Sequence, residues 1–391
     1  MYFRRDHKMR FDKKKLQNIE YILPLILLAL FLIGIVAITI ATANPFTGEE
    51  LTFSEIMANL DFSVVGLQGA FFAVGLVVMV LIMLVDYRLY AKIWYAVLAA
   101  GVVLLLLVVF FGKTRGGTQG WIYLNASGSI TFQPSELVKL AMILVCAKFM
   151  ADRPMERFID VLPAAGVFVL IIAVLLYQMD IGTTIVYVAA FVGMAFMAGV
   201  KLRYIGAFGL AGAAFGVFAW FVLMGDRQRS RIINFFSGGE GDDFLQLNRS
   251  IAVIGSGGFA GKGLFSVGAL SQLNYIPVIE TDFIFVAIAE SFGFLGCFFL
   301  LLVYAAFIFR MWYLARITKD KFGALIIYGI MFMFMFHIFE NIGMTIGIMP
   351  ITGIPLPFIS KGGTNLVTNM AAVGLVLSVR FHRELTEKES I

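Results

Sequence analysis

The side chains most able to do chemistry in this chain are a few ionisable residues placed where long apolar runs begin or end. Asp282 follows a polar segment that contains Pro277, and it opens an apolar run that continues to about Phe309. Ionisable groups at the mouth of a membrane helix must be compensated, so an acid there is a candidate for function. The structural alternative is that Thr281 or Asp282 caps the helix by accepting free backbone N–H groups.

A second pair of charges opens an earlier apolar run, within FQPSELVKL (132–140). Pro134 suits the first turn of a helix, and Glu136 and Lys139 are then neighbours on one helix face. The two charges could form a purely structural ion pair one turn below the surface. They could equally line a cavity for a polar ligand.

Arginines lie in the long segment 225–281, which precedes the apolar run that Asp282 opens. Arg229 and Arg231 occur in RSRIINF, and Arg249 follows further along. The first two could be interfacial residues that bury their stems and keep the guanidinium in water. The alternative is an anionic ligand, and a lipid-anchored substrate that carries phosphate would suit one acid and a group of cations.

The glycine-rich run GSGGFAGKG (255–263) could also approach an anion. It is not a P-loop, because Ser256 stands where the first glycine is required and Gly263 follows the lysine. A flexible backbone with Lys262 near an anionic group is what remains of this interpretation.

Composition places these residues in a membrane protein. The chain has 391 residues, of which 60% are hydrophobic and 14% charged, and its mean hydropathy is +0.92. Long uncharged runs of this kind indicate a polytopic membrane protein. Cys146 and Cys297 both fall in apolar runs, so neither a disulfide framework nor metal-ligand spacing is present. The first run, 21–43, is too long for a signal peptide and is interpreted as a retained anchor.

The predicted fold is all-α, with about ten transmembrane helices. The candidate spans are residues 20–43, 63–85, 93–111, 134–151, 158–177, 181–200, 204–224, 282–309, 323–345 and 363–380. Several exceed the roughly 20 residues that cross a bilayer core, which predicts tilt. Glu290 lies about two turns inside the eighth span, and the spacing does not name its partner.

Charge orients these spans. Most of the 30 Lys and Arg residues lie in the two tails and the connections on one side, which the positive-inside rule places in the cytoplasm. We expect a basic cytoplasmic tail over 1–19, a ten-span membrane domain over 20–380 and a cytoplasmic tail over 381–391. The large extracytoplasmic segment 225–281 would join spans 7 and 8. Irregular backbone gathers on this outer side, where it must line a cavity or pack against protein, so the site is expected there.

Several long motifs together resemble those of the SEDS family (shape, elongation, division and sporulation). They are FQPSELVKL, RSRIINF, IAVIGSGGFAGKG, SQLNYIPVIETDFIF and NIGMTIGIMPITGIPLPFISKGGT, in the order and spacing of the family. Trp121 with Ile122 and the run QMDIGT also fit. SQLNYIP is closer to the elongation members than to the division members. The resemblance implies a ten-span plasma-membrane glycosyltransferase that polymerises lipid II into peptidoglycan strands.

The resemblance also implies roles for individual residues. Asp282 would be the general base that takes the proton of an attacking sugar hydroxyl. Cations would neutralise the departing diphosphate, and the Glu136–Lys139 pair would shape the polar cavity. The residues expected to bind the substrate are Trp121, Glu136, Lys139, Arg229, Arg231, Arg249, Lys262, Glu280 and Ser360.

The chain departs from the family pattern at four positions. Family members usually have His where this chain has Glu280 and Tyr where it has Lys361. Gly120 stands in place of Arg, and Met179 in place of Pro. A second carboxylate two residues from Asp282 could make that residue a better base, or it could mark a specialised member with a different partner or acceptor.

The implied partners are lipid II and a class B penicillin-binding protein, a monofunctional transpeptidase; no nucleic acid is expected. No cofactor is firmly implied, although a divalent cation (Mg²⁺ or Mn²⁺) could bind the diphosphate. The expected location is the bacterial plasma membrane, with multiple spans and both termini in the cytoplasm.

Two other functions compete with polymerisation. A flippase or transporter of lipid-linked precursors would favour mid-membrane charges and broken helices in pseudo-symmetric halves, and the sequence shows neither a repeat nor a charge ladder. A non-catalytic scaffold for a transpeptidase would be favoured by loss of the acid at position 282, and Asp282 is present.

Overall fold

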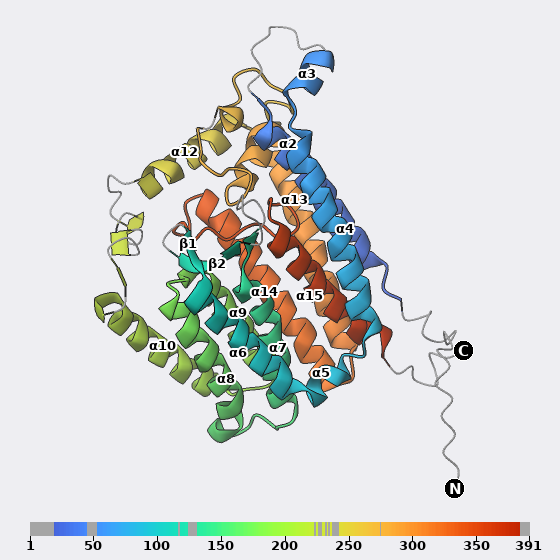
Figure 1. Cartoon of the computed structure of the whole chain (residues 1–391), viewed down its shortest axis with the longest axis vertical. Helices are drawn as coiled ribbons and strands as arrows, with labels where there is room; N and C mark the ends of the chain where they lie inside the picture. The colour runs from blue at the N-terminus through green and yellow to red at the C-terminus, as the bar shows by residue number, and fades with distance from the viewer. Residues whose placement is uncertain are drawn as a thin grey trace.

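The computed structural model describes residues 19–44, 53–115, 118–123, 131–222, 224–225, 229–230, 233, 235–236, 242–273 and 275–383. Most of these residues are α-helical, as the apolar runs predict (Figure 1). The helices are α2 (Ile22–Thr42), α3 (Phe53–Asn59), α4 (Phe62–Leu84), α5 (Arg88–Lys92), α6 (Trp94–Phe111), α7 (Pro134–Ala151), α8 (Phe158–Tyr177), α9 (Ile181–Met197), α10 (Leu202–Val222), α12 (Asp242–Ser256), α13 (Ile284–Ile317), α14 (Lys321–Thr345) and α15 (Gly363–Phe381). The expected tails lie outside the described residues over 1–18 and 384–391.

Each of the ten expected spans coincides with one helix. Eight of these helices are long and apolar enough to cross a membrane, namely α2, α4, α6, α8, α10, α13, α14 and α15. The other two are α9, which has only 17 residues, and α7, which carries Glu136, Lys139 and Lys148. The all-α polytopic membrane fold is confirmed, whereas the number of ten spans stays a prediction.

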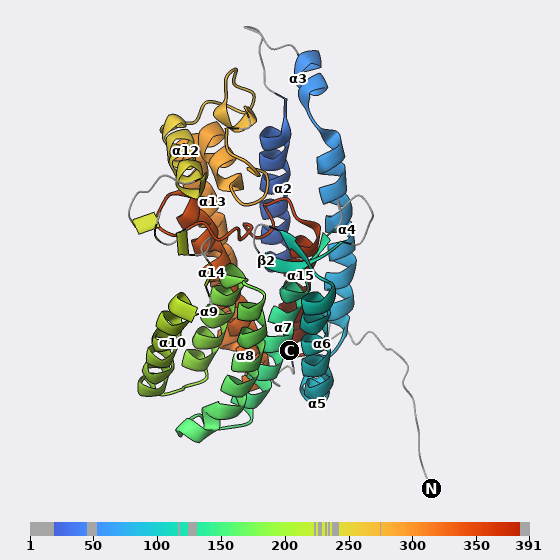
Figure 2. The same ribbon diagram turned by 60° about the vertical axis from the view of Figure 1, so that its left-hand side comes forward.

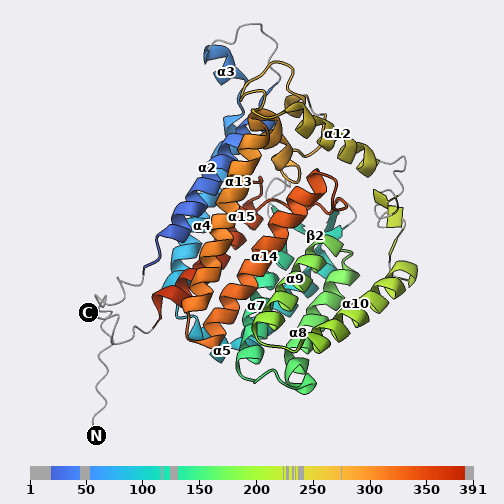
Figure 3. The same cartoon turned by 180° about the vertical axis from the view of Figure 1, so that it is seen from behind.

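α14 is the central helix of the bundle (Figure 3). It packs against α7, α9, α13 and α15, and most of its side chains are buried. α15 is also largely buried and packs against α4. α10 lies at the edge of the bundle, where Ala219 is its one buried residue (Figures 1 and 2). Polar side chains on α7, α14 and α15 are therefore shielded from lipid and can form a site inside the bundle.

Small residues allow the central helices to approach closely. A Cβ atom at Gly374 of α15 would lie 2.8 Å from the carbonyl oxygen of Met79 in α4. Close fit of this kind drives helix association in a membrane, where hydrophobicity alone does not.

The outer connections contain more regular structure than the sequence predicted. Residues of the expected loop 112–133 form a small antiparallel sheet of β1 (Lys113–Arg115), β2 (Thr118–Tyr123) and β3 (Thr131–Phe132), in that order. The expected loop 225–281 contains α12, which packs against α13 and α14, and the short 3₁₀ helix η1 (Leu270–Gln272). α12 and α3 lie at the end of the molecule away from the start of α2 (Figure 1).

α13 is broken at Gly293. This residue has φ 63° and ψ −160°, a conformation essentially confined to glycine. The outer part of α13 before the break is buried, whereas Phe294 and Leu295 just after it are exposed. The break therefore lies where α13 passes from the protein interior to its surface.

The glycine segment (residues 257–263) satisfies the backbone groups that the break releases. Four backbone bonds replace the helical ones: Lys262 N to Glu290 O at 2.9 Å, Gly263 N to Ser291 O at 3.0 Å, Phe294 N to Gly258 O at 3.0 Å and Leu295 N to Phe259 O at 3.1 Å. A Cβ atom at Gly257, Gly261 or Gly293 would overlap the opposing backbone. Non-helical backbone at membrane depth is tolerated where other protein groups bind it in this way.

Candidate functional site

Asp282 lies in a tight turn just before α13. The helix begins at Ile284 with Phe283 at the N-cap position and without a side-chain cap. The Thr281 hydroxyl donates to the Val278 carbonyl at 3.0 Å. Neither Thr281 nor Asp282 occupies the capping position, so the helix-cap alternative loses its main support.

The turn that carries Asp282 is strained. Val278 has φ 52°, which is a true outlier for a β-branched residue. The N–H groups of Thr281 and Asp282 both donate to the Val278 carbonyl, at 3.1 and 3.3 Å. Strained backbone persists only where surrounding contacts enforce it, and it gathers at functional sites.

Asn341 of α14 ties this turn to the outer loop 346–362. Its side-chain N–H groups donate to the carbonyls of Asp282 and Ile354, both at 2.8 Å, and the residue is fully buried. A Cβ atom at Gly353 would lie 3.4 Å from a carboxylate oxygen of Asp282. The carboxylate of Asp282 therefore faces the outer loop, beside a glycine that leaves room for it.

Two departures from the family pattern contact each other beside Asp282. The ammonium of Lys361 lies 3.5 Å from a carboxylate oxygen of Glu280. The Lys361 N–H also donates to the Glu280 carbonyl at 2.9 Å. The unusual acid is therefore matched by an unusual cation 81 positions later in the chain.

A second polar cluster lies inside the bundle, among α7, α14 and α15. The Lys139 ammonium lies 2.9 Å from a Glu136 carboxylate oxygen and 3.1 Å from Nε2 of His337. Asn365 donates to the other Glu136 oxygen at 3.0 Å, and Asn369 donates to Asn365 at 2.8 Å. Because an ammonium can only donate, His337 accepts through Nε2 and carries its proton on Nδ1. The predicted Glu136–Lys139 pair thus forms, within a network of buried side chains.

α14 joins the two groups of polar residues. His337 contacts Lys139, and Asn341 contacts the Asp282 turn. The two α14 residues are four positions apart, so they share a face and lie about 6 Å apart along the helix axis. The Glu136–Lys139 cluster is therefore about one helical turn further into the bundle than the helix mouth.

Trp121 and Asp180 lie near the start of α7. Trp121 is half-buried in β2, a strand that contacts α7. Asp180 caps α9 by accepting from the Thr183 N–H at 3.1 Å, and it also accepts from the Gln133 amide at 3.2 Å. Burial raises the pKa of the Asp180 carboxyl above its ordinary value, and the hydrogen bonds from Thr183 oppose that shift. Asp180 is therefore a helix-capping residue.

The expected outer cations have different surroundings. Arg229 donates to the carbonyls of Trp220 and Phe221 in the last turn of α10, at 2.8 and 3.1 Å. Arg231 lies outside the described residues. A role for either residue in binding diphosphate stays a prediction.

Arg249 contacts the segment that precedes Asp282. Its guanidinium donates to the Tyr275 carbonyl at 3.1 Å and lies 4.9 Å from the centroid of the Tyr275 ring. Gln246, one turn earlier on α12, donates to the Pro277 carbonyl at 3.1 Å. α12 therefore holds the chain just ahead of the Asp282 turn.

Lys262 is paired with Glu290. The spacing of residues in the sequence had not identified the partner of this acid. The charged atoms of the pair lie 2.7 Å apart. Glu290 is only 1% exposed and also accepts from the N–H groups of Leu270 and Ser271, both at 2.9 Å. The glycine-rich run therefore holds α13 and the outer segment together, and Lys262 could reach a phosphate only by sharing or leaving this ion pair.

The remaining predictions are a substrate contact at Ser360 and a divalent cation bound to the diphosphate. The Ser360 hydroxyl accepts from the Leu356 N–H at 2.8 Å and is buried, so it shapes the end of the outer loop. Among the described residues, no group of three or more His, Cys, Asp or Glu side chains could hold a metal ion.

Four polar residues of the site were absent from the predicted set: His337, Asn341 and Asn369, which are buried, and Asn365, which is half-buried. The signal that could have found the last two is their spacing, because Asn365 and Asn369 are an i,i+4 pair of amides in an apolar span. Asn341 belongs to a quoted motif but forms its contacts with residues 13 and 59 positions away.

Comparisons with known proteins find relatives over most of the chain. A family model described as "Cell cycle protein", covering FtsW, RodA and SpoVE, matches residues 20–385. Peptidoglycan glycosyltransferase MrdB of Escherichia coli is 35% identical over 322 residues, which cover 81% of this chain and 85% of that protein. Stage V sporulation protein E of Bacillus subtilis is 31% identical over 374 residues, which cover 92% and 96%.

Solved structures share the fold. A chain described under "Structural coordination of polymerization and crosslinking by a peptidoglycan synthase complex" aligns with a TM-score of 0.77 at 26% identity, covering 93% of this chain and 97% of that one. Rod shape determining protein RodA of Thermus thermophilus aligns with a TM-score of 0.68 at 25% identity, covering 94% and 98%. The chain belongs to the FtsW/RodA/SpoVE family, the SEDS family that its motifs resemble.

Proposed function

We propose that this protein is a peptidoglycan glycosyltransferase that polymerises lipid II at the outer leaflet of the bacterial plasma membrane. Relatives named for this activity support the proposal, at up to 35% identity over most of the chain. The proposed mechanism rests on the position of Asp282. Its backbone is held by α14, and its carboxylate faces the outer loop rather than capping a helix.

In the proposed reaction, a sugar hydroxyl of one lipid-linked molecule attacks the anomeric carbon of another. Asp282 takes the proton of that hydroxyl, the new C–O bond forms, and the bond from the anomeric carbon to the diphosphate breaks. The diphosphate leaves with the bonding electron pair. Positioned cations and hydrogen-bond donors would stabilise the developing negative charge.

The buried network around Glu136 and Lys139 would form the polar inner wall of the substrate cavity. Its charges are already paired and its side chains fixed by hydrogen bonds, so it can offer polar contacts without reorganising. A divalent cation such as Mg²⁺ or Mn²⁺ would bind through the diphosphate itself.

The direct test is to incubate the purified protein with lipid II, with and without a class B transpeptidase, and to resolve glycan products on a gel. We expect glycan strands whose formation depends on Asp282. Absence of strands under both conditions, with a folded protein, would overturn the proposal. Transport of intact lipid II between leaflets of a vesicle, without strand formation, would support the flippase alternative.

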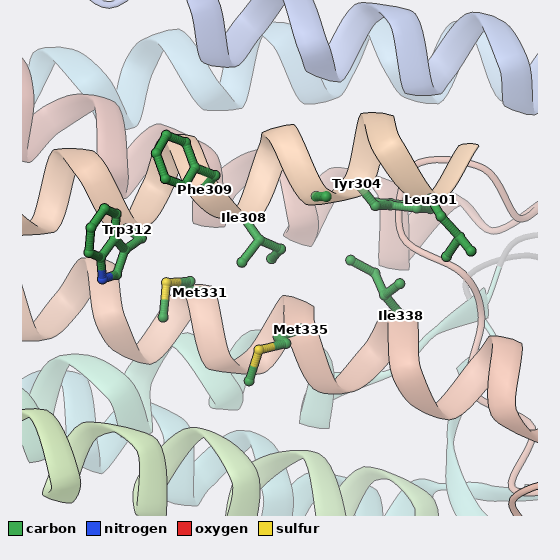
Figure 4. Close-up of a pocket in the computed structure, with 9 residues that line it drawn as sticks. Leu301, Tyr304, Ile308, Phe309, Trp312, Met331, Met335 and Ile338 are labelled. Atoms are coloured by element: carbon green, nitrogen blue, oxygen red, sulfur yellow. The ribbon is translucent and has the colours of Figure 1, made fainter. Parts of the chain in front are cut away.

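The proposed partner is a transpeptidase with a single membrane span. A solved relative belongs to a complex that coordinates polymerisation and crosslinking. In this chain an apolar groove of about 470 Å³ runs between α13 and α14 (Figure 4). It is lined by Leu301, Tyr304, Ala305, Ile308, Phe309 and Trp312 of α13 and by Met331, Met335 and Ile338 of α14. A single apolar helix could fit into this groove, since helix association in lipid depends on close fit.

The orientation follows from charge. We propose that both termini lie in the cytoplasm, which places α12, the small sheet and the Asp282 turn on the outer side, where lipid II would be used.

A further inference from the structure

The described cations of the outer side differ in how far their charge is already engaged. Lys262 is paired with the buried carboxylate of Glu290 at 2.7 Å. Arg229 is engaged by backbone carbonyls at the end of α10, and Arg249 by the carbonyl and ring of Tyr275. Each of these cations already makes at least one structural contact.

Lys361 is placed differently. Its ammonium lies 3.5 Å from Glu280, a longer and weaker contact than that of Lys262, and its side chain is 35% exposed. Its backbone N–H donates to the carbonyl of Glu280, two residues before Asp282. Lys361 is therefore a partly solvated cation that the main chain fixes beside the turn bearing the proposed base.

The ion pair is not needed to hold the outer loop in place. Gln68 of α4 donates to the Ser360 carbonyl and accepts from the Gly362 N–H, both at 3.2 Å. Together with the backbone bond from Lys361 to Glu280, these contacts fix the backbone on both sides of Lys361. The Lys361 ammonium can leave Glu280 while the loop keeps its conformation.

We propose that Lys361 binds the diphosphate of the lipid-linked substrate, and that Glu280 holds its ammonium beside Asp282 when no substrate is bound. This inference rests on the proposed function for the identity of the substrate. An ammonium on a flexible stem is suited to this task, because it can turn from one anion to another as a compact point charge. A diphosphate carries more negative charge than Glu280, so it would draw the ammonium away.

The experiment compares Lys361→Gln and Glu280→Gln in the full-length protein in detergent. Binding of farnesyl diphosphate and farnesyl monophosphate is measured by thermophoresis, and the melting temperature of each variant is recorded. Lys361→Gln should weaken diphosphate binding by about three- to tenfold, with a smaller effect on the monophosphate. Glu280→Gln should leave diphosphate binding unchanged or make it tighter, because it removes the competing anion. Lys361→Arg, which keeps the charge, should bind like the wild type.

If the ion pair between Lys361 and Glu280 is purely structural, both glutamine variants break the same contact. They should then weaken diphosphate binding to the same extent. That result, or unchanged diphosphate binding in Lys361→Gln, would overturn the inference. Lys113→Gln serves as the matched control, since Lys113 is an exposed outer lysine that stacks on Tyr123. The lipid II assay separates the two proposals. If the Lys361→Gln protein forms glycan strands and binds diphosphate normally, the Lys361 site alone is refuted. If the two glutamine variants have opposite effects on diphosphate binding but the wild type forms no strands, only the polymerase proposal is refuted.

Discussion

At the scale of single residues, the site is a set of charges whose partners have been fixed by folding. Asp282 is the acid that the fold presents toward the outer loop, and Glu290 is the acid that the fold encloses. The two are only eight positions apart in the chain, yet they have opposite surroundings. Substitution of Asp282 should therefore lower activity without unfolding the protein, whereas substitution of Glu290 should lower its stability.

Asp282→Asn should abolish most polymerisation without unfolding the protein. Asn keeps the size of the side chain but cannot accept the proton, and removal of a general base typically lowers the rate by about 10²–10⁴. The measurement is lipid II polymerisation alongside melting temperature. Glu280→Gln is the control and should be milder. A stable Asp282→Asn protein that polymerises at nearly the wild-type rate would contradict the mechanism, and a more damaging Glu280→Gln would reassign the base.

Glu290→Ala should destabilise the outer segment. It removes the acceptor of two backbone N–H groups and leaves Lys262 without its carboxylate, so we expect the free energy of unfolding to fall by about 2 kcal/mol or more. Hydrogen exchange over residues 264–281 should accelerate together with a lower melting temperature. Lys262→Ala should be milder, because Glu290 keeps the bonds from Leu270 and Ser271. Unchanged exchange in Glu290→Ala would show that the segment is held by other contacts.

At the scale of elements, the site depends on how the glycine segment, α12 and α14 fix the mouth of α13. The glycine segment exchanges four backbone hydrogen bonds with the break at Gly293. α12 holds Tyr275 and Pro277, and α14 holds Asp282 and Ile354 through Asn341. Three separate elements therefore position one turn.

Gly261→Ala should damage this arrangement much more than Gly263→Ala. Both glycines have positive φ, 83° and 97°, so both substitutions carry a backbone cost. Only at Gly261 would the added Cβ overlap the backbone of Ser291, whereas nothing lies within 4 Å of the added Cβ at Gly263. We expect Gly261→Ala to lose about 1–3 kcal/mol beyond its control, measured by thermal or denaturant unfolding in detergent. Equal losses of stability in the two variants would mean that the glycine segment can move away from α13 without further destabilising the protein.

The sequence predicted those parts of the structure that depend on local pattern. Apolar runs of sufficient length placed the spans, and the i,i+3 spacing of Glu136 and Lys139 placed them on one face of α7. The pair Lys262–Glu290 could not be predicted, because its members are 28 positions apart and no local periodicity links them. The small sheet was missed since two of its three strands, β1 and β3, have only three and two residues, too few to show alternation.

The break in α13 was missed for a related reason. A single glycine in an apolar helix has no signature that distinguishes a break from close packing, and Gly293 takes its conformation only because the glycine segment is opposite it. The predicted group of cations around the diphosphate assumed that outer charges would be available, whereas folding engages Lys262, Arg229 and Arg249 with structural partners.

At the scale of the whole molecule, the bundle encloses its polar network and leaves an apolar groove open between α13 and α14. The same two helices bear Asp282 at the mouth of one and Asn341 on the other. A partner helix in the groove would therefore touch the elements that position the base, which gives a physical route for coupling between polymerisation and crosslinking.

Ala305→Trp should weaken binding of a co-expressed class B transpeptidase. The larger side chain would fill part of the groove, and overpacking of a fitted interface costs about 1–3 kcal/mol, which corresponds to a loss of affinity of about five- to 160-fold. The measurement is the amount of transpeptidase that co-purifies in detergent. Ala213→Trp on the outer face of α10 is the matched control, because Ala213 is also exposed. Equal co-purification of the two variants would exclude the groove as the docking site.

The break in α13 also has a consequence for membrane insertion during synthesis. The part of α13 after Gly293 would span about 36 Å at 1.5 Å per residue, which exceeds the roughly 30 Å of the hydrocarbon core, so it can leave the translocon as a complete span. In the part before Gly293, the carbonyls of Glu290 and Ser291 accept from N–H groups of the glycine segment. That segment is translated earlier and must wait on the outer side until α13 arrives. The turn carrying Asp282 is also held by Asn341 of α14, so it can assume its final shape only after α13 and α14 have both been inserted.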